Sequence, residues 1–463
     1  MALPNSFVSA VREAVGGEYV LGHAQNLAPY AADALGIGSP PDIVAIPGNT
    51  KEIAAVARLC NEHRVPLVVR GAGTGYTGGA VPTRGGVVLS MERLNRILEI
   101  DQTNLLAVVE PHVITGDLQR EVEKVGLFYP PDPASLETSS IGGNVAECAG
   151  GPRAFKYGTT KRYVLGLEAV LANGEIINTG SKAVKNVVGY DLTQLLVGSE
   201  GTLAIITKIT LRLVPQPPAR ATLSASFGNI DAAVDAVSGL LRYRVVPATI
   251  ELIDGDSLRA VEAYVGRGFA GAEALLIVES DGTPAAVDEE IDRVEKACRE
   301  SGALQVTRAA NDAERAELWS ARRQVSLALR ATGLHKINHD VVVPRGRVPE
   351  LFAVVAELQQ TYGLRIASFG HAGDGNIHVN LMLDKDDAAQ RERAKGAERV
   401  LFERVVGLEG SISGEHGIGF AKARYLGIEL SAEEIALMKR VKAAFDPHGI
   451  LNPGKIFPPD PES

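Results

Sequence analysis

The sequence predicts an α+β protein of more than one domain, and three observations lead to that prediction. The chain has 463 residues, enough for two or three domains with hydrophobic cores. Residues 40–215 begin with one strand–helix–strand unit. Short strands separated by many glycines and prolines follow it. From residue 219, longer blocks alternate strands with helices, which is typical of an antiparallel sheet with helices on one face.

The first part opens with the strand–helix–strand unit. Apolar strands are expected at 40–47 and 65–70. Between them, Asn49 or Thr50 can cap a helix over 49–63, whose apolar residues recur on one face. These segments predict an α/β beginning to the first domain.

One turn and one linker mark the later course of the chain. Asn173-Gly174 separates two runs of alternating polarity, which is a strong signal for a β-hairpin. Pro217-Pro218 follow the last strand of the first part, so we place the domain boundary there. In the second part, helices are expected over 231–242, 285–299, 312–332 and 348–361.

Composition and charge exclude several classes of function. The formal net charge of −9 makes nucleic acid and anionic membrane surfaces poor partners. The three cysteines, Cys60, Cys148 and Cys298, are too scattered for a disulfide framework or a cysteine-ligated iron–sulfur cluster. The sequence shows no signal peptide and no transmembrane segment. We therefore expect a cytoplasmic protein, either fully soluble or peripheral at a membrane.

Residues 70–79, RGAGTGYTGG, form a glycine-rich segment directly after a predicted strand. The segment contains GxGxxG, but loop and strand patterns follow it, whereas a Rossmann dinucleotide loop opens a helix. Its backbone N–H groups could still bind a pyrophosphate, because glycine allows positive φ and close approach. A tight surface turn is the alternative.

A second glycine-rich segment covers 130–151 and carries almost no charge. An exposed linker would be more polar, so we expect a buried loop. A buried loop must satisfy its backbone polar groups, and contact with a flat polar cofactor is one way to do so.

The second part contains HAGDGNIH at 371–378 and GEHGIG at 414–419. Two imidazoles and a carboxylate suit a divalent metal with open positions for a substrate or water. By spacing alone, a polar turn that carries histidines is the more common explanation of the first segment, and both explanations stay open at this point.

Eight motifs in a fixed order resemble one family. They are RGAGTGYTGG, PPDPAS, IGGNVAECAGG, KYG, LVGSEGTLAIIT, HAGDGNIH, GEHGIG and LNPGKIF, within residues 38–457. Together they resemble the FAD-linked D-2-hydroxyacid dehydrogenases of the vanillyl-alcohol-oxidase flavoprotein superfamily. That family includes the flavin subunit of glycolate oxidase, D-lactate dehydrogenase and D-2-hydroxyglutarate dehydrogenase.

The resemblance implies a domain organisation. A two-part FAD-binding domain of the PCMH type would occupy 1–218, with its core at about 38–217. An α+β cap domain built on an antiparallel sheet would occupy 219–431, and a segment at 432–463 would return to the FAD domain.

The resemblance also implies that FAD is bound by both glycine-rich segments, with the pyrophosphate on 70–79. Neither segment contains a histidine, so we expect non-covalent FAD. The residues implied to hold it are Arg70, Gly71, Ala72, Gly73, Thr74, Gly75, Gly78, Gly79, Pro131, Asp132, Ser135, Gly142, Gly143, Asn144, Ala146, Tyr157, Gly158, Glu200, Gly201, Ile206 and Asn452.

For the histidine segments, the resemblance favours the metal explanation. It implies His371, His378 and Glu415 as ligands of a divalent ion, and His416 as the catalytic base. Zinc is expected, and manganese, iron or cobalt would suit the same ligand types. Asn380 shares a strand face with His378 and is a candidate substrate contact.

Substrate contacts are also expected on the helix over 312–332. Arg322 and Ser326 lie one turn apart there. The resemblance implies that Arg322 binds the substrate carboxylate together with Lys336, although Lys336 is shifted by one residue from the family pattern. Arg323 is the competing arginine.

The implied activity is oxidation of a small 2-hydroxy acid, of the D-lactate, glycolate or D-2-hydroxyglutarate type, to the 2-oxo acid, with hydride transfer to flavin N5. This chain has no cysteine cluster for onward electron transfer. The electrons would go to an iron–sulfur subunit, an electron-transfer flavoprotein or a quinone. Two alternatives remain: a flavin-holding subunit active only in a glycolate oxidase-like complex, and a same-fold enzyme acting on another alcohol. The oligomeric state is open, and a homodimer is one option.

Overall fold

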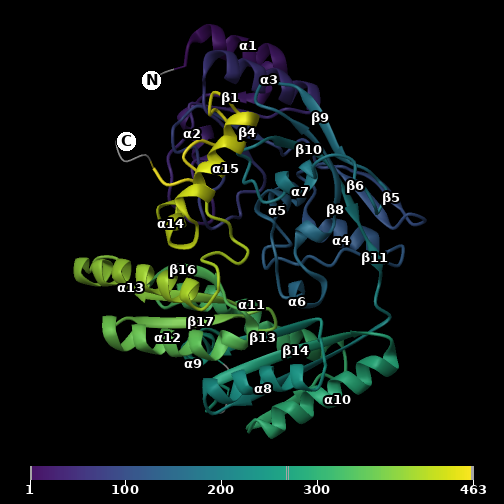
Figure 1. The fold of residues 1–463 in the computed structure, drawn as a ribbon, viewed down its shortest axis with the longest axis vertical. Helices are drawn as coiled ribbons and strands as arrows, with labels where there is room; N and C mark the ends of the chain where they lie inside the picture. Colours follow the sequence, from purple (N-terminus) through teal and green to yellow (C-terminus); the bar gives the residue numbers. More distant parts are fainter. Residues whose placement is uncertain (1–2, 267, 270, 460–463) are drawn as a thin grey trace. The chain divides into compact units, whose positions relative to one another are not determined.

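The computed structural model describes residues 3–266, 268–269 and 271–459. The chain forms two compact units, each built from separate stretches of sequence (Figure 1). Unit 1 comprises Met1–Ala149, Thr159–Gln216 and Glu415–Ser463, and unit 2 comprises Gly150–Gly158 and Pro217–Gly414. The combination of helices with largely antiparallel sheets confirms the predicted α+β class.

The first sheet of unit 1 has the strand order β1-β2-β4-β3, in which β4 runs parallel to both β2 and β3. Its strands are β1 (Val20–Leu21), β2 (Ile43–Ala45), β3 (Leu67–Arg70) and β4 (Val87–Ser90). The predicted helix between the first two parallel strands is α3 (Thr50–His63), and the Asn49 side chain caps it by accepting from the N–H groups of Lys51 and Glu52.

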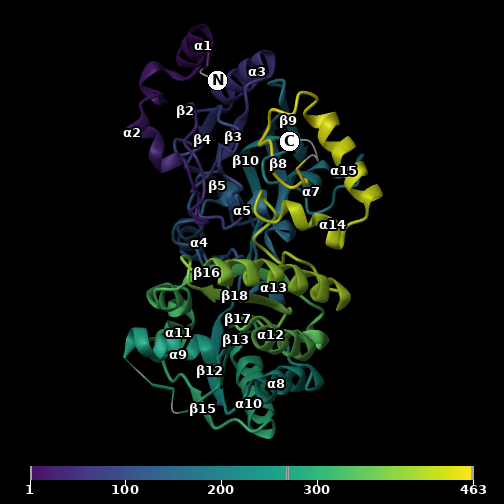
Figure 2. The ribbon, with the colours of Figure 1, turned by 90° about the vertical axis from the view of Figure 1, so that its left-hand side faces the viewer.

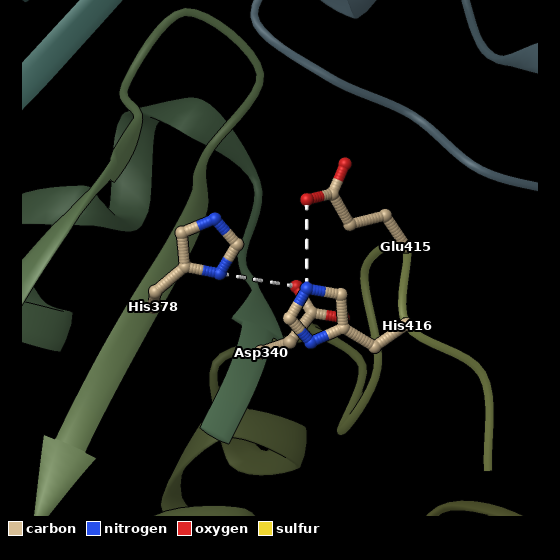
Figure 3. Close-up of side chains that lie close together, drawn as sticks. All are labelled: Asp340, His378, Glu415 and His416. Atoms are coloured by element: carbon tan, nitrogen blue, oxygen red, sulfur yellow. Dashed lines mark ion pairs between the residues drawn. The ribbon is translucent and has the colours of Figure 1, made fainter. Parts of the chain in front are cut away.

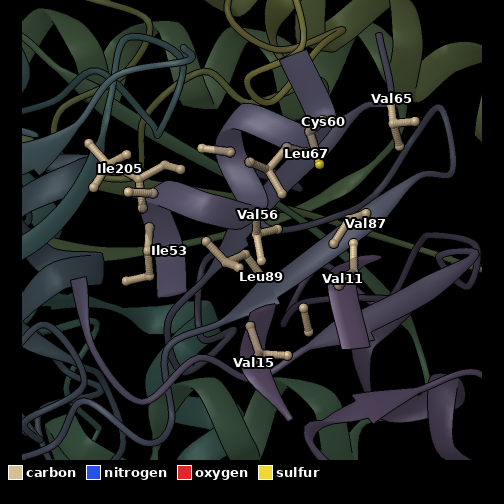
Figure 4. Close-up of a cluster of buried hydrophobic side chains, with 14 of the residues drawn as sticks. Val11, Val15, Ile53, Val56, Cys60, Val65, Leu67, Val87, Leu89 and Ile205 are labelled. Carbon is tan, nitrogen blue, oxygen red and sulfur yellow. The ribbon is translucent and has the colours of Figure 1, made fainter. Parts of the chain in front are cut away.

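A hydrophobic core lies between this sheet and the helices α1 (Asn5–Val15) and α3 (Figure 4). Val11 and Val15 come from α1, and Ile53, Val56 and Cys60 come from α3. All of these side chains are nearly inaccessible to solvent, so burial of apolar surface fixes the strand that precedes the glycine-rich loop.

The second sheet of unit 1 is antiparallel, with the order β5-β6-β10-β8-β9. The hairpin expected at Asn173-Gly174 joins its last two strands, and Gly174 adopts φ +84°. The strands are β5 (Ile97–Asp101), β6 (Leu106–Val109), β8 (Val164–Val170), β9 (Ile176–Gly180) and β10 (Ile205–Arg212), and a separate pair is formed by β7 (Leu127–Phe128) and β11 (Val214–Pro215).

Unit 1 has further α-helices. They are α2 (Ala24–Leu27), α4 (Thr115–Glu123), α5 (Ile141–Glu147), α7 (Leu192–Leu196), α14 (Leu426–Glu429) and α15 (Ala432–Phe445). Helix α5 corrects one expectation, because 130–151 was expected to be loop throughout. Ser140 caps the helix, and Ile141 and Val145 are buried on one face, which outweighs the cost of its two glycines.

Unit 2 contains one antiparallel sheet with the order β15-β12-β14-β13-β17-β18-β16. Its strands are β12 (Ala219–Phe227), β13 (Thr249–Asp254), β14 (Ala274–Gly282), β15 (Gln305–Arg308), β16 (His335–Val342), β17 (Arg365–His371) and β18 (Asn376–Leu383). Its helices are α6 (Ala154–Tyr157), α8 (Ile230–Arg242), α9 (Gly255–Val265), α10 (Pro284–Glu300), α11 (Asp312–Ala331), α12 (Val348–Tyr362) and α13 (Ala388–Gly407).

Helices cover both faces of this sheet, not one face as expected (Figure 2). Helices α9 and α11 pack against one face through a core that includes Ile253, Ile277, Val325 and Phe369. Neighbouring strand residues such as Leu276 point to the other face and are also buried, where α8 and α10 contact the sheet. A strand buried on both faces is apolar throughout, so polar residues in it need a specific partner.

Among the described residues, no helix combines the length and the apolar character needed to cross a bilayer.

Candidate active site

The loop at 70–79 connects β3 to β4 without a helix, as predicted. Arg70 is 9% exposed, and its guanidinium donates to the carbonyl oxygens of Ala32 and Pro29 at 2.9 and 3.2 Å. At Gly73, φ is +69° and an added Cβ would lie 2.2 Å from that guanidinium, so a larger residue would be strained and would displace Arg70. Arg70 therefore supports the shape of the loop, while Ala72, Thr74 and Gly75 stay partly exposed at its centre.

The second glycine-rich segment packs directly on this loop. The Ser140 hydroxyl accepts from the Gly143 N–H at 3.3 Å, and a Cβ on Gly71 would lie 2.4 Å from the same hydroxyl oxygen. At the other end of α5, the Ala146 carbonyl accepts from the Glu200 N–H at 2.9 Å. Unit 1 thus brings together three of the segments predicted to hold FAD.

A fourth segment comes from the C-terminal part of the chain. Leu451 forms a β-bridge with Leu67, and the Asn452 N–H donates to the Leu67 carbonyl at 2.8 Å. The Asn452 amide donates to the carbonyl oxygens of Gly79 and Glu200 at 2.8 and 2.7 Å. Asn452 is 2% exposed, so these contacts are part of the buried structure of unit 1.

Two carboxyl groups lie beside this loop. The Glu200 carboxylate accepts from the N–H groups of Ile418 and Gly419 at 2.8 and 2.7 Å. A Cβ on Gly417 would lie 2.2 Å from Glu147 Oε2 and 2.9 Å from Glu200 Oε1. Burial and the nearby charge of Glu200 raise the pKa of Glu147 well above its ordinary value.

The other residues predicted to hold FAD are distributed as follows. The Pro131 carbonyl accepts from Gln119 at 2.9 Å, Asp132 is 9% exposed, and Ile206 lies in β10. Tyr157 and Gly158 belong to unit 2, where the Tyr157 hydroxyl donates to Asp281 at 2.7 Å.

The polar atoms around the loop fit a ligand that donates hydrogen bonds. Asp33 Oδ2 and Asn452 Oδ1 are buried acceptors with no donor among the described residues. A Cβ on Gly75 would lie 3.8 Å from Asp33 Oδ2, which places this acceptor at the loop. The ribityl and ribose hydroxyls and the imide N–H of FAD are donors of the required kind, so the residues of unit 1 fit FAD.

Four side chains elsewhere form a group that could hold a metal ion (Figure 3). Asp340, His378, Glu415 and His416 each place one ligand atom within 4.8 Å of the others. Asp340 on β16 is the direct register partner of His378 on β18. Glu415 and His416 directly follow Gly414, whose N–H donates to Asp340 Oδ2 at 3.0 Å, so chain connectivity keeps Glu415 near Asp340. Imidazole and carboxylate ligands together suit zinc, manganese or iron.

Three metal ligands were predicted, and two of them, His378 and Glu415, belong to this group. The third, His371, lies next to the group but is not part of it. Its ring centroid is 5.4 Å from that of His378. Its Nδ1 atom is hydrogen-bonded to the buried carboxylate of Glu251. Because Nδ1 faces Glu251, a metal ion bound by His371 would be held at Nε2.

The predicted substrate residues all lie in unit 2. Arg322 is 8% exposed and its Nε donates to Glu251, whereas Arg323 is exposed and donates to a carbonyl of its own helix. Lys336 donates to the Ser326 hydroxyl at 2.8 Å. Burial and the nearby charge of Arg330 lower the pKa of Lys336 to about 8.

Asn380, the fourth predicted substrate contact, is fully buried within the sheet. Its amide donates to the carbonyl oxygens of Ala367 and His378 at 2.9 and 3.0 Å and accepts from Asn338 at 2.7 Å. These contacts hold β17, β18 and β16 together beside the histidines.

Two residues of this region were not predicted, Glu251 and Asp340. Glu251 is the one charged residue inside TIEL at the start of β13, and Asp340 precedes an apolar VVV run. A carboxylate within a buried apolar strand is a sequence signal for a paired or ligating group.

Comparisons with known proteins give the family. Residues 216–456 match the family model described as FAD linked oxidases, C-terminal domain, and residues 41–180 match an FAD binding domain. The chain belongs to the FAD-linked oxidases. The resemblance inferred from the eight motifs is thereby confirmed.

Curated relatives of this FAD-linked oxidase are similar over nearly their whole length. The glycolate oxidase subunit GlcD of Bacillus subtilis is 46% identical over 91% of this chain and 90% of its own. GlcD of Escherichia coli K12 is 38% identical over 99% of this chain and 93% of its own. A D-lactate dehydrogenase of Archaeoglobus fulgidus is 39% identical over 89% of this chain and 91% of its own.

Solved structures agree on the fold of this FAD-linked oxidase. p-Cresol methylhydroxylase matches with a TM-score of 0.81 over 98% of this chain and 96% of its own, at 19% identity. Alkyldihydroxyacetonephosphate synthase matches with a TM-score of 0.77 over 97% of this chain and 86% of its own, also at 19% identity. At such identities the match supports the architecture alone.

Proposed function

We propose that this chain oxidises a small 2-hydroxy acid to the 2-oxo acid, using FAD and a divalent metal ion. The observation that carries the proposal is the group of Asp340, His378, Glu415 and His416, because a flavin enzyme needs no such set for redox chemistry alone. The names of the relatives, glycolate oxidase subunit and D-lactate dehydrogenase, support the same substrate class.

The chain's own residues supply binding, orientation and proton transfer. Arg322 and Lys336 would pair with the substrate carboxylate, since a guanidinium and an ammonium are the strongest donors to that group. His416 would accept the hydroxyl proton at a ring nitrogen. Its ring stacks on Tyr76 with centroids 5.5 Å apart, and its carbonyl accepts from Thr77, which fixes its orientation in unit 1.

The two bound groups would each add one kind of chemistry. His378, Glu415 and His371 would hold the metal ion, with Asp340 as an additional ligand or as a support for His378. A divalent ion in such a site polarises a hydroxyl group, and FAD accepts the hydride equivalent when bound. Zinc remains our first choice for the metal, since imidazole and carboxylate ligands are typical of it.

The test is an anaerobic absorbance spectrum of the purified protein with D-lactate, L-lactate, glycolate or D-2-hydroxyglutarate. Bleaching of the flavin by one acid, lost on chelation and restored by added metal, is the expected result. Bleaching that survives complete metal removal would contradict the metal proposal. A flavin that none of the acids reduces would contradict the substrate class.

A second candidate is a flavin-holding subunit that works only within a complex, and the word subunit in the names of two relatives favours it. Electrons would then leave through an iron–sulfur partner, with an electron-transfer flavoprotein or a quinone as other acceptors. Flavin reduction by the isolated chain separates this candidate from the first. The cysteines are unpaired among the described residues, which is compatible with the cytoplasmic location that we propose.

A further inference from the structure

Glu251 is a buried charge at the centre of unit 2. It lies in β13, its side chain is 0% exposed, and the neighbouring strand residues Ile250 and Leu252 are buried too. Removing a carboxylate from water is unfavourable unless partners compensate. The Glu251 carboxyl group faces two such partners, the guanidinium of Arg322 and the ring of His371.

Each oxygen of Glu251 has its own partner. Oε1 is bonded to Nδ1 of His371, and Oε2 accepts from Nε of Arg322. The first contact follows from sheet register, because Glu251 and His371 are direct partners across β13 and β17. The second comes from α11, where the Arg322 guanidinium also lies over the ring of Phe369 at 4.7 Å. The geometry of both partners is therefore set by packing on one face of the sheet.

These contacts restrict what each partner can do. A carboxylate only accepts hydrogen bonds, so a neutral His371 ring carries its proton on Nδ1 and its lone pair on Nε2. Nε2 is then the atom that can bind a metal. Arg322 uses Nε on Glu251, which leaves its terminal N–H groups for a carboxylate ligand.

We infer that Glu251 is a positioning residue that orients His371 for the metal ion and Arg322 for the substrate carboxylate through one carboxylate. This inference rests on the proposed function, since it assigns those roles to His371 and Arg322. It implies that the two binding events share one support, so that a change at Glu251 weakens both.

Glu251→Gln separates this role from a purely structural one. Glutamine has one acceptor oxygen and one donor NH₂ group, so it can serve either Arg322 or His371 correctly, but not both. If the oxygen takes Arg322, the NH₂ group faces His371 and favours the proton on Nε2, which then cannot bind a metal. Glu279→Gln is the matched control. Glu279 is 6% exposed on the adjacent strand β14 and bonds to Thr222 and to Trp319 of α11.

The readout is metal affinity, measured on the FAD-loaded protein by competition between zinc and a chelator of known affinity. Glu251→Gln should lower it by about 10–100-fold and raise KM for the acid, while Glu279→Gln leaves both unchanged. Unchanged metal affinity together with an unchanged KM in a folded Glu251→Gln variant would overturn the inference. A wild-type protein that binds no metal would instead overturn the metal part of the proposed function.

The double variant Glu251→Gln/Arg322→Met keeps the inference testable if the single variant does not fold. It removes the buried arginine that glutamine cannot neutralise, and the amide oxygen is then available to the His371 N–H. Metal affinity should return to within a few-fold of wild type, while KM for the acid stays raised. Loss of metal affinity in a folded double variant would contradict the proposed control of the His371 tautomer.

Discussion

At the scale of single residues, Lys336 links protonation to substrate binding. Its pKa of about 8 means that it carries its charge at neutral pH and loses it in mildly alkaline solution. A neutral amine attracts a carboxylate less, so kcat/KM for the hydroxy acid should fall as the pH rises through about 8. A charged hydrogen bond contributes about 1.5–3 kcal/mol, which corresponds to tenfold or more.

Lys336→Met should remove this fall and raise KM at pH 7, and rates measured from pH 6.5 to 9.5 check it. Lys385→Met, at an exposed position of the same unit, is the control and should keep the wild-type profile. If kcat/KM of Lys336→Met falls with rising pH as it does in the wild type, the fall belongs to the titration of another group.

Gly417 is a second position where we expect a single substitution to have a large effect, here on FAD binding. It has φ +80°, and both Glu147 and Glu200 occupy the space that a side chain would need. Gly417→Ala should displace these carboxyl groups and the adjacent His416, and weaken FAD binding by tenfold or more. Gly449, with φ +64° and no atom within 4 Å of an added Cβ, isolates the backbone effect.

Gly449→Ala should cost about 1–3 kcal/mol of stability from backbone strain and leave FAD affinity unchanged. Flavin fluorescence titration of both apoproteins, together with urea unfolding, measures the two effects. Equal FAD affinity in the two variants would show that the contacts at Gly417 do not support the cofactor pocket.

At the scale of elements, helix α15 holds the segment that carries Asn452. The Lys442 ammonium, on this helix, bonds to Asp446 and donates to the carbonyl oxygens of Thr202 and Leu451 at 2.7 and 2.9 Å. Asp446 in turn accepts from the N–H groups of Ile450 and Leu451. One lysine therefore joins the helix, the loop after it and the segment next to Glu200.

Lys442→Met should destabilise unit 1 by about 3–5 kcal/mol, because it leaves Asp446 buried without its counter-charge. Urea unfolding followed by flavin release measures this loss. Arg440→Met changes an exposed residue of the same helix and should shift the midpoint little. A similar small shift in both variants would contradict the proposed role of Lys442.

Elements with a strong local signal could be predicted from the sequence. The Asn49 cap and the Asn173-Gly174 turn specify α3 and the β8–β9 hairpin by short-range geometry, and both are present. Helix α5 could not be foreseen, because its glycines have low helix propensity and its stability depends on tertiary burial of Ile141 and Val145.

Some residues of the candidate site could likewise be predicted from the sequence, and others could not. Motifs supplied the glycine loop, the histidines and Arg322, since each has a characteristic local pattern. Glu251 has no such pattern, because its partners His371 and Arg322 are chosen by strand register and helix packing. Asp340 likewise comes next to His378 only when β16 pairs with β18, which the sequence does not show.

At the scale of the whole molecule, the two units should unfold separately, and two natural probes can follow them. The sequence contains one tryptophan, Trp319, which lies on α11 and packs against a hydrophobic core of unit 2. Most of the residues proposed to hold the flavin lie in unit 1. In urea, Trp319 fluorescence and flavin release should therefore show different midpoints.

Added FAD should stabilise only the flavin transition, by about 2.7 kcal/mol at a concentration 100 times Kd. Comparing both probes at two FAD concentrations checks this. Coincident midpoints that move together with FAD would mean that the two units unfold as one cooperative body.

The interrupted sequence of unit 1 has a consequence for biosynthesis. Leu451 and Asn452 bond to Leu67, yet the ribosome makes them almost four hundred residues later. The stretch 217–414, which forms most of unit 2, emerges before the last part of unit 1 exists. The nascent chain should therefore complete the seven-stranded sheet of unit 2 before unit 1 is complete, and it should retain FAD only when translation is nearly finished.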